Sequence, residues 1–189
     1  MAVPLVEKAH QKIAVYLQEA DHAVDATMGN GYDTVFLAEK VGQHGKVHAF
    51  DLQSAALTAT DARLKDKGLS ERVNLIQDNH ENLASYLANN KIESVRCIVF
   101  NLGYLPGSDK TIQTSPQTTV QALNSGLLSL QKPGIISVLA YTGHIGGRQE
   151  AEAVKVWAMA LDKQHYRVTI DIPPLVKQSP PELVLVESI

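Results

Sequence analysis

The chain has 189 residues, 44% of them hydrophobic, which is enough to bury one substantial core. Lys and Arg number 17 against 20 Asp and Glu, and the formal net charge of -3 excludes an overall basic surface, although a local basic patch stays open. The single cysteine excludes an internal disulfide, and no stretch approaches the roughly 20 apolar residues of a membrane span. We therefore expect a single domain over residues 1–189, a cytoplasmic location and no membrane partner.

Hydrophobic periodicity predicts helices that alternate with short apolar strands. Helical patterns fall at residues 3–20, 28–41 (a loop and a helix), 54–67, 81–89, 118–130 and 150–162. Strand patterns fall at residues 23–27, 46–51, 73–77, 95–100, 135–140, 166–172 and 182–187. The last two strands have no helix between them, which predicts an antiparallel pair at the sheet edge. The fold class is therefore α/β, with a seven-stranded, mostly parallel sheet, helices on both faces and an antiparallel C-terminal strand.

The first strand ends at a Gly-x-Gly turn, Gly29 to Gly31, which leads into a helix. Glycines at such a junction let the backbone approach a ligand, and the helix N-terminus offers free N–H groups. Thr34 stands where a dinucleotide-binding motif has its third glycine, so a dinucleotide is disfavoured. Asp51 ends the second strand about 20 residues further on, where an acid accepts hydrogen bonds from ribose hydroxyls. We expect a nucleotide-like cofactor here; the alternative is a plain turn, with Asp51 capping the next helix.

Other polar residues stand close to the first and third strand ends. Asp25 precedes the turn, where it can orient loop N–H groups or meet a ligand ammonium. Asp33 lies in the first turn of the following helix, where an acid also suits the helix dipole alone. Asp78 and His80 follow the third strand, where an adenine amino group would be met, and capping of an Asx turn is the alternative for Asp78.

The fourth strand ends at Asn101, Gly103 and Tyr104. The asparagine offers a carbonyl acceptor and the tyrosine an aromatic face, so together they can hold an amine or a planar base beside a reactive methyl group. A bare turn would use the same glycine. The polar segment over residues 108–119 predicts a lid or substrate loop, and a second glycine-rich loop over residues 141–148 follows the fifth strand.

Four stretches carry a resemblance to a known family. They are Asp25-Ala-Thr-Met-Gly-Asn-Gly-Tyr-Asp-Thr34, the pair Asp51 and Gln53, Asn101-Leu-Gly-Tyr-Leu-Pro-Gly-Ser-Asp-Lys110, and Tyr141-Thr-Gly-His-Ile-Gly-Gly147. With them, nearly the whole chain resembles the rRNA methylase family of class I S-adenosylmethionine-dependent methyltransferases. The resemblance implies a Rossmann-like domain that binds S-adenosyl-L-methionine.

Within that family, the chain is similar to bacterial enzymes that methylate 5-aminomethyl-2-thiouridine at the tRNA wobble position. The resemblance implies N-methylation of this aminomethyl group, with the tRNA anticodon loop as partner. Three alternatives stay open: a small-molecule methyltransferase, an rRNA methyltransferase and a nucleotide-binding protein without catalysis.

The resemblance and the strand-end residues together give the predicted site. The predicted cofactor-binding residues are Asp25, Thr27, Gly29, Asn30, Gly31, Asp33, Asp51, Gln53, Asp78, His80 and Asn101. The predicted catalytic residues are Asp33, Asn101 and His144, and the predicted substrate-binding residues are Tyr104, Tyr141, Lys110 and Arg148. Asp33 and His144 are the candidates to accept a proton from a protonated amine, and the alternative for His144 is an ordinary surface histidine.

The positions of the cysteine and the histidines limit which methyl acceptors and which metal sites are expected. Cys97 lies inside the predicted fourth strand, which favours a nitrogen or oxygen methyl acceptor over a pyrimidine carbon, because carbon methylation normally uses a thiolate. The single cysteine excludes a Cys-x-x-Cys pattern, and no structural metal is expected. Lys8, Lys12, Lys110 and Arg148 are local cations that either contact RNA phosphates or are simply solvated. The lid and the edge strand leave room for a homodimer.

Overall fold

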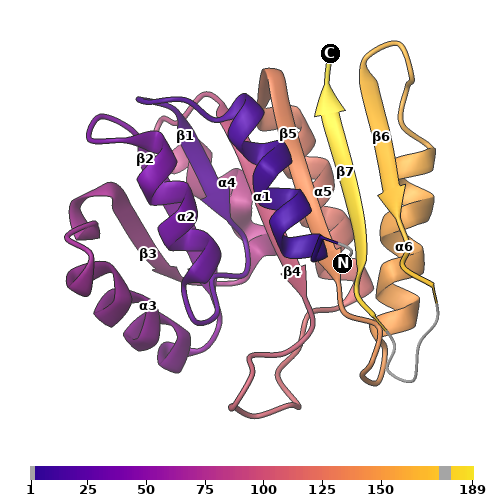
Figure 1. The fold of residues 1–189 in the computed structure, drawn as a ribbon, viewed down its shortest axis with the longest axis horizontal. Coiled ribbons are helices and arrows are strands. Elements are labelled where there is room, and N and C mark those ends of the chain that lie inside the picture. Colours follow the sequence, from indigo (N-terminus) through magenta and orange to yellow (C-terminus); the bar gives the residue numbers. More distant parts are fainter. Residues whose placement is uncertain (1–2, 175–179) are drawn as a thin grey trace.

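Seven strands form the centre of the computed structural model, which describes residues 3–174 and 180–189 (Figure 1). They are β1 (His22–Asp25), β2 (Lys46–Asp51), β3 (Val73–Gln77), β4 (Val95–Leu102), β5 (Leu130–Ala140), β6 (Tyr166–Asp171) and β7 (Glu182–Ser188). Their order in the sheet is β3-β2-β1-β4-β5-β7-β6. Neighbours among β1 to β5 pair in parallel, whereas β7 is antiparallel to β5 and β6. The predicted sheet is confirmed.

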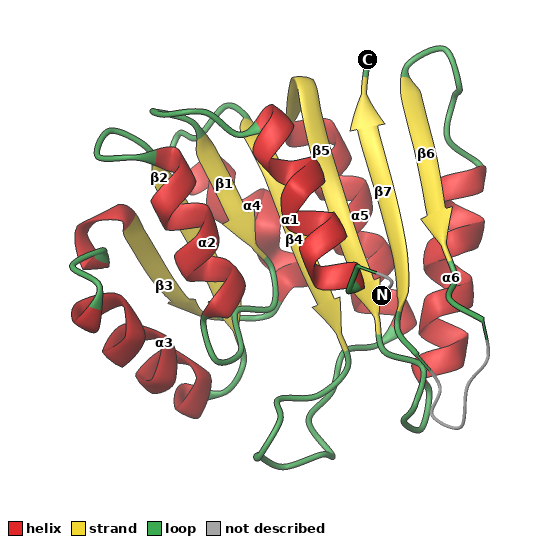
Figure 2. Ribbon diagram, in the orientation of Figure 1, coloured by secondary structure: helices red, strands yellow, loops and turns green. Residues whose placement is uncertain are grey.

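Helices cover both faces of this sheet (Figure 2). One face carries α1 (Leu5–Tyr16), α2 (Tyr32–Val41) and α3 (Ser54–Asp66), and the other carries α4 (Leu83–Asn89), α5 (Pro116–Ser129) and α6 (Gly147–Met159). Two short 3-10 helices, η1 (Ser70–Arg72) and η2 (His80–Asn82), flank β3. The organisation as a single domain over residues 1–189 stays a prediction.

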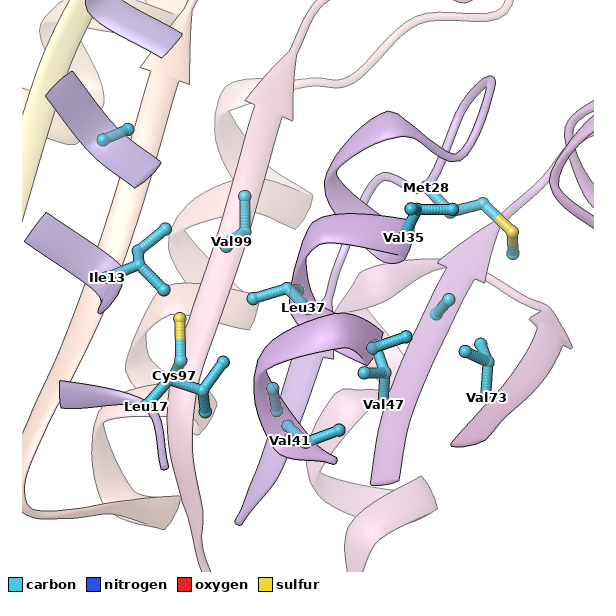
Figure 3. Close-up of a cluster of buried hydrophobic side chains, with 14 of the residues drawn as sticks. Ile13, Leu17, Met28, Val35, Leu37, Val41, Val47, Val73, Cys97 and Val99 are labelled. Atoms are coloured by element: carbon cyan, nitrogen blue, oxygen red, sulfur yellow. The ribbon is translucent and has the colours of Figure 1, made fainter. Parts of the chain in front are cut away.

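Strand β4 shows how the two cores are divided. Cys97 and Val99 point into the cluster under α1 and α2, where they meet Ile13 and Leu37 (Figure 3). The next residues along the strand belong to the opposite cluster, because successive side chains of a strand face opposite sides. Burial raises the pKa of the Cys97 thiol, so this cysteine is an inert core residue.

The parallel strands bring their carboxyl ends to one edge of the sheet. The chain passes from β1 to β2 on one side and later inserts β4 on the other side of β1, so the strand order reverses between β1 and β4. Open α/β sheets bind ligands at such a reversal. The segment between β4 and α5, residues 103–115, extends beyond this edge and is called the β4–α5 segment below (Figure 2).

Several boundaries differ from those predicted. Helix α5 begins at Pro116 because Ser115 is its N-cap and proline suits the first helical turn, which shortens the predicted polar loop. Helix α6 begins at Gly147 rather than residue 150, and its N-cap, Gly146, is left-handed. Strand β5 begins at Leu130 because that residue already pairs with β4. Among the described residues, no helix is both long enough and apolar enough to cross a bilayer.

Candidate functional site

A cleft of about 590 Å³ lies at the carboxyl ends of β1 to β5. This volume is in the range of small-molecule and cofactor sites. Most of the predicted site residues line it: Thr27, Gly29, Asn30, Asp33, Asp51, Gln53, Asp78, His80, Asn101, Tyr104, Tyr141 and His144. Asp25, Gly31, Lys110 and Arg148 lie outside the lining. Helix α1 and the β4–α5 segment close two sides of the cleft.

The glycine turn is held in place by α3. Thr60 donates from Oγ1 to the Gly29 carbonyl at 3.1 Å, and Arg63 donates from Nε to the Asn30 carbonyl at 2.9 Å. Gly31 has a left-handed φ of 79°, and a Cβ there would lie 2.7 Å from Thr60 Oγ1. The turn therefore requires glycine at residue 31 both for its backbone conformation and for the approach of α3.

Asp51 joins the turn to the end of β2. Its carboxylate accepts hydrogen bonds from the backbone N–H groups of Gly29 at 3.0 Å and Gln53 at 2.9 Å. Burial raises the pKa of Asp51, and these hydrogen bonds act in the opposite direction. The N-cap residue of α3 is Gln53 and not Asp51. Asp51 thus lies on the cleft wall beside the turn, where ribose hydroxyls would be met.

Asp25 is fully buried beneath the turn. It accepts hydrogen bonds from Thr34 Oγ1 at 2.6 Å and from the Thr27 N–H at 3.2 Å. Burial and the nearby charge of Asp33 raise the pKa of Asp25 to about 7. Asp25 lies outside the cleft lining and contacts the loop and α2, and its functional role stays a prediction.

The Asp33 carboxylate contacts the end of β4. Asn101 donates from Nδ2 to Asp33 Oδ2 at 2.5 Å, and His10 Nε2 lies 2.5 Å from Asp33 Oδ1. The Asn101 backbone N–H donates to Thr27 Oγ1 at 2.7 Å, which ties the ends of β1 and β4 together. All four side chains line the cleft. His10 was missed by the sequence reasoning, since one histidine on the flank of an amphipathic helix gives no signal of its partner.

The end of β3 supplies an unpaired nitrogen. Asp78 Oδ1 accepts from the Asn79 N–H at 2.7 Å and from Asn82 Nδ2 at 2.8 Å, so its carboxylate shapes the turn into η2. His80 is buried, and its Nε2 has no hydrogen-bond partner within residues 3–174 and 180–189. Burial lowers the pKa of His80 to about 4, so the imidazole is neutral. A buried polar atom without a partner beside a cleft is consistent with a site for a polar ligand.

His144 is held on the opposite wall. Its Nδ1 lies 3.1 Å from Gln113 Oε1 and 3.0 Å from the Ile145 carbonyl, and since both are acceptors, Nδ1 carries the proton. Its Nε2 is buried with no partner in the described part of the chain, and a Cβ on Gly147 would lie 2.7 Å from it. The free nitrogen of His144 therefore packs against backbone in this structure.

Tyr104 and the β4–α5 segment complete this wall. The Tyr104 ring meets the His144 ring edge to face at 5.7 Å, and Lys110 Nζ lies 5.4 Å from the centroid of the Tyr104 ring. Thr114 accepts from the Gly103 N–H at 2.9 Å and donates to buried Glu150 at 2.7 Å. Sequence reasoning missed Glu150, although it falls on the buried face of α6 at helical spacing.

The donor set fits a nucleoside cofactor and gives no sign of a metal centre. The turn residues Gly29 and Asn30, together with Asp51 and His80, line one continuous cleft. Among the residues that the structure describes, no three His, Cys, Asp or Glu side chains gather as a metal site would require.

Comparison with known proteins identifies the family. A family model described as "Putative rRNA methylase" matches residues 47–187. The chain is 37% identical over 163 residues to the chloroplastic tRNA (mnm(5)s(2)U34)-methyltransferase of Arabidopsis thaliana. That match covers 82% of this chain but 59% of the relative, so the chain spans less than two thirds of that protein.

Two solved structures match over both whole chains. A putative rRNA methylase from Clostridium thermocellum has a TM-score of 0.94 and 38% identity. A putative methyltransferase from Streptococcus mutans, solved in complex with SAH, has a TM-score of 0.89 and 35% identity. Because the family model covers most of the chain and both structures share its whole fold, this chain belongs to the "Putative rRNA methylase" family of S-adenosylmethionine-dependent methyltransferases, and S-adenosylmethionine is its cofactor.

Proposed function

We propose that the protein methylates RNA, and specifically the amino nitrogen of 5-aminomethyl-2-thiouridine at the tRNA wobble position. The observation that carries this proposal is the Asp33 carboxylate, which Asn101 holds at 2.5 Å on the cleft wall. An anionic group at the reaction site suits a cationic amine as methyl acceptor. The name of the Arabidopsis relative, which specifies the mnm(5)s(2)U34 position of tRNA, supports this substrate.

The cofactor would be held by the ends of β1, β2 and β3. Asp51 would accept hydrogen bonds from the ribose hydroxyls, and the backbone of the Gly29 to Gly31 turn would lie against the ligand. Asp78 and His80 would face the adenine. The bound cofactor supplies an electrophilic methyl group on a sulfonium sulfur.

The amine must lose a proton before its lone pair can attack. Asn101 uses its N–H to hold Asp33, so its carbonyl oxygen is left to accept an N–H of the substrate. The Asp33 carboxylate binds the ammonium and takes one proton, which leaves a neutral amine facing the methyl donor. His144 is the poorer of the two predicted acceptors in this conformation, because its free nitrogen is buried.

The position of the cysteine also bears on which kind of atom accepts the methyl group. Methylation of a pyrimidine carbon would need a thiolate in the cleft, and Cys97, the one cysteine of the sequence, is buried in β4. Nitrogen or oxygen is therefore a better acceptor than carbon, and the Asp33 carboxylate favours an amine nitrogen.

The RNA would be recognised at the rim of the cleft. Tyr104 and Tyr141 line the cleft and can stack on a splayed anticodon base. Lys110 and Arg148 are exposed and can contact phosphates, whereas Lys8 already pairs with Asp171 at 2.6 Å. A homodimer remains part of the proposal.

The test is methyl transfer to tRNA that lacks the final modification. The protein is incubated with labelled S-adenosylmethionine and total tRNA from cells in which wobble uridines stop at the aminomethyl stage, and the nucleosides are then analysed. We expect label in 5-methylaminomethyl-2-thiouridine. The D33N variant should lose most of this label, whereas D162N, which alters an exposed carboxylate paired with His165, should not. Label in free metabolites or rRNA, with none in tRNA, would contradict the proposal.

A further inference from the structure

His10 lies beside the carboxylate on which the proposed reaction depends. Its Nε2 is 2.5 Å from Asp33 Oδ1, while Asn101 Nδ2 is 2.5 Å from Asp33 Oδ2. The two donors come from α1 and β4, and Asp33 comes from α2. Each carboxylate oxygen thus has its own donor, which restricts rotation of the carboxylate about its last side-chain bond.

The hydrogen-bond chemistry leaves one arrangement for this group. The carboxylate is an acceptor, so both the His10 Nε2 and the Asn101 Nδ2 must carry the hydrogen. Neither donor uses both lone pairs of its oxygen, so each oxygen of Asp33 keeps an acceptor position. His10, Asp33 and Asn101 all line the cleft, where such a position can meet a substrate N–H.

The imidazole itself is held in a defined plane. The rings of His10 and Phe36 are stacked with centroids 3.8 Å apart and an interplanar angle of 3°. Phe36 follows Asp33 by three residues on α2, so one helix provides both the carboxylate and the surface against which the histidine lies. The donor is therefore oriented before any ligand binds.

The contact between His10 and Asp33 is not needed to attach α1 to the sheet. Ala9, Ile13 and Leu17 are buried and attach α1 to the sheet, whereas the His10 side chain is 27% exposed. A partly exposed ion pair contributes about 0–1 kcal/mol, which is small beside the burial of those apolar side chains. The position of His10 is better explained by the orientation of Asp33.

We propose that His10 is a positioning residue of the methyl-transfer site: its Nε2–H holds Asp33 Oδ1 so that the carboxylate faces the substrate amine. This role rests on the proposed function, because it requires an amine in the cleft. His10 acts through Asp33, and Asn101 performs the corresponding task on the other oxygen.

Two variants separate the hydrogen bond from the ring stack. H10F keeps an aromatic ring against Phe36 but removes the donor, whereas H10Q loses the ring but offers an amide donor near the position of Nε2. H165F is the matched control, since His165 pairs with Asp162 at 3.0 Å on an exposed surface. Thermal melts of all variants check that each is folded.

The first readout is binding without turnover. Affinities are measured in the presence of S-adenosylhomocysteine for two anticodon stem-loops, one with 5-aminomethyl-2-thiouridine and one with 5-methyl-2-thiouridine at the wobble position. We expect the wild-type protein and H165F to bind the amine stem-loop about tenfold more tightly, since a hydrogen bond to a charged group is involved. H10F should reduce this preference below about threefold, and H10Q should retain most of it.

The second readout is the split between kcat and KM. H10F should lower kcat by roughly ten- to a hundredfold and change the KM for tRNA by less than about threefold, with H10Q close to wild type. In a D33N background, H10F should cause no further loss, because the residue acts through that carboxylate. Additive losses would indicate a separate structural effect and overturn the proposal.

The binding measurements test the proposed function and the role of His10 separately. Equal affinity of the wild-type protein for the two stem-loops overturns the proposed function, and with it this role for His10. A wild-type preference that H10F keeps in full overturns the role of His10 alone.

Discussion

The Ser108 hydroxyl donates a 2.6 Å hydrogen bond to the side-chain carbonyl of Gln53. Ser108 lies in the β4–α5 segment, and Gln53 lies two residues after Asp51, the last residue of β2, so this bond links a long loop to the wall of the cofactor cleft. The loop is also tied at its other end through Thr114 and Glu150. It is thus attached on both sides of the cleft.

Removing the Ser108 hydroxyl should loosen the attachment of the β4–α5 segment to the end of β2. We expect S108A to release S-adenosylhomocysteine about three- to tenfold faster, which corresponds to one neutral hydrogen bond of ordinary strength. Stopped-flow displacement measures the rate, and S85A, at an exposed position of α4, is the control. If S108A and S85A release the ligand at the wild-type rate, the Ser108 contact does not retain the cofactor.

The Asp51 carboxylate offers a second test, because both oxygens are engaged by backbone N–H groups. Asparagine can accept from only one of the two, and its amide would oppose the other donor. We expect D51N to weaken S-adenosylmethionine binding by about ten- to a hundredfold in calorimetry, through the loss of charge-assisted hydrogen bonds. D61N, in an exposed pair with Lys65, should bind normally. Unchanged affinity of D51N would mean that the cofactor does not meet this carboxylate.

Gly31 should be intolerant of a side chain for two separate reasons. Its φ is +79°, and a Cβ would lie 2.7 Å from Thr60 Oγ1 and 3.0 Å from Thr60 Cα, where backbone cannot give way easily. Gly68 has a similar φ of +66°, but nothing lies within 4 Å of a Cβ there. In urea titrations, G68A should cost about 1 kcal/mol of unfolding free energy and G31A clearly more. Equal costs would show that the contact with α3 is unimportant.

His48 should make stability depend on pH. Its Nε2 lies 3.0 Å from His22 Nδ1, and burial lowers the pKa of His48 to about 4. The unfolded chain takes up a proton near its ordinary pKa of about 6.5, whereas the folded protein does not until about 4. Between these values the unfolded state binds more protons, so this contribution to stability falls as the pH falls, by about 1 kcal/mol per pH unit.

The His48 contribution must be separated from that of Asp25. The raised pKa of Asp25 acts with the opposite sign in the same window, because there the folded state holds the extra proton. We therefore compare the unfolding free energies of the wild type and H48Q at each pH from 4 to 7, a difference from which Asp25 cancels. The gap should widen in favour of H48Q as the pH falls. H165Q, an exposed histidine, should show no such trend.

The arrangement of the C-terminal strands β6 and β7 could be predicted largely from their hydrophobic patterns. The two apolar runs predicted an antiparallel pair at the sheet edge, and β7 and β6 form that pair, with β7 next to β5 and β6 outermost. The burial patterns explain this order, because β7 is buried on both faces whereas β6 alternates. The uninterrupted apolar run at Leu183 to Val186 is typical of an interior strand, so the order was accessible from the sequence.

By itself, the sequence determined the fold class, the glycine turn and the acid at the end of β2, because these depend on local periodicity and on neighbours in the chain. Only the tertiary structure shows the different surroundings of the two candidate proton acceptors. His144 and Asp33 both follow the predicted pattern, yet the free nitrogen of one packs under Gly147 while the other meets Asn101 and His10 in the cleft. The reason is physical: the environment of a side chain is made by partners from distant parts of the chain, 68 and 23 residues away for Asp33, and no local pattern encodes that meeting.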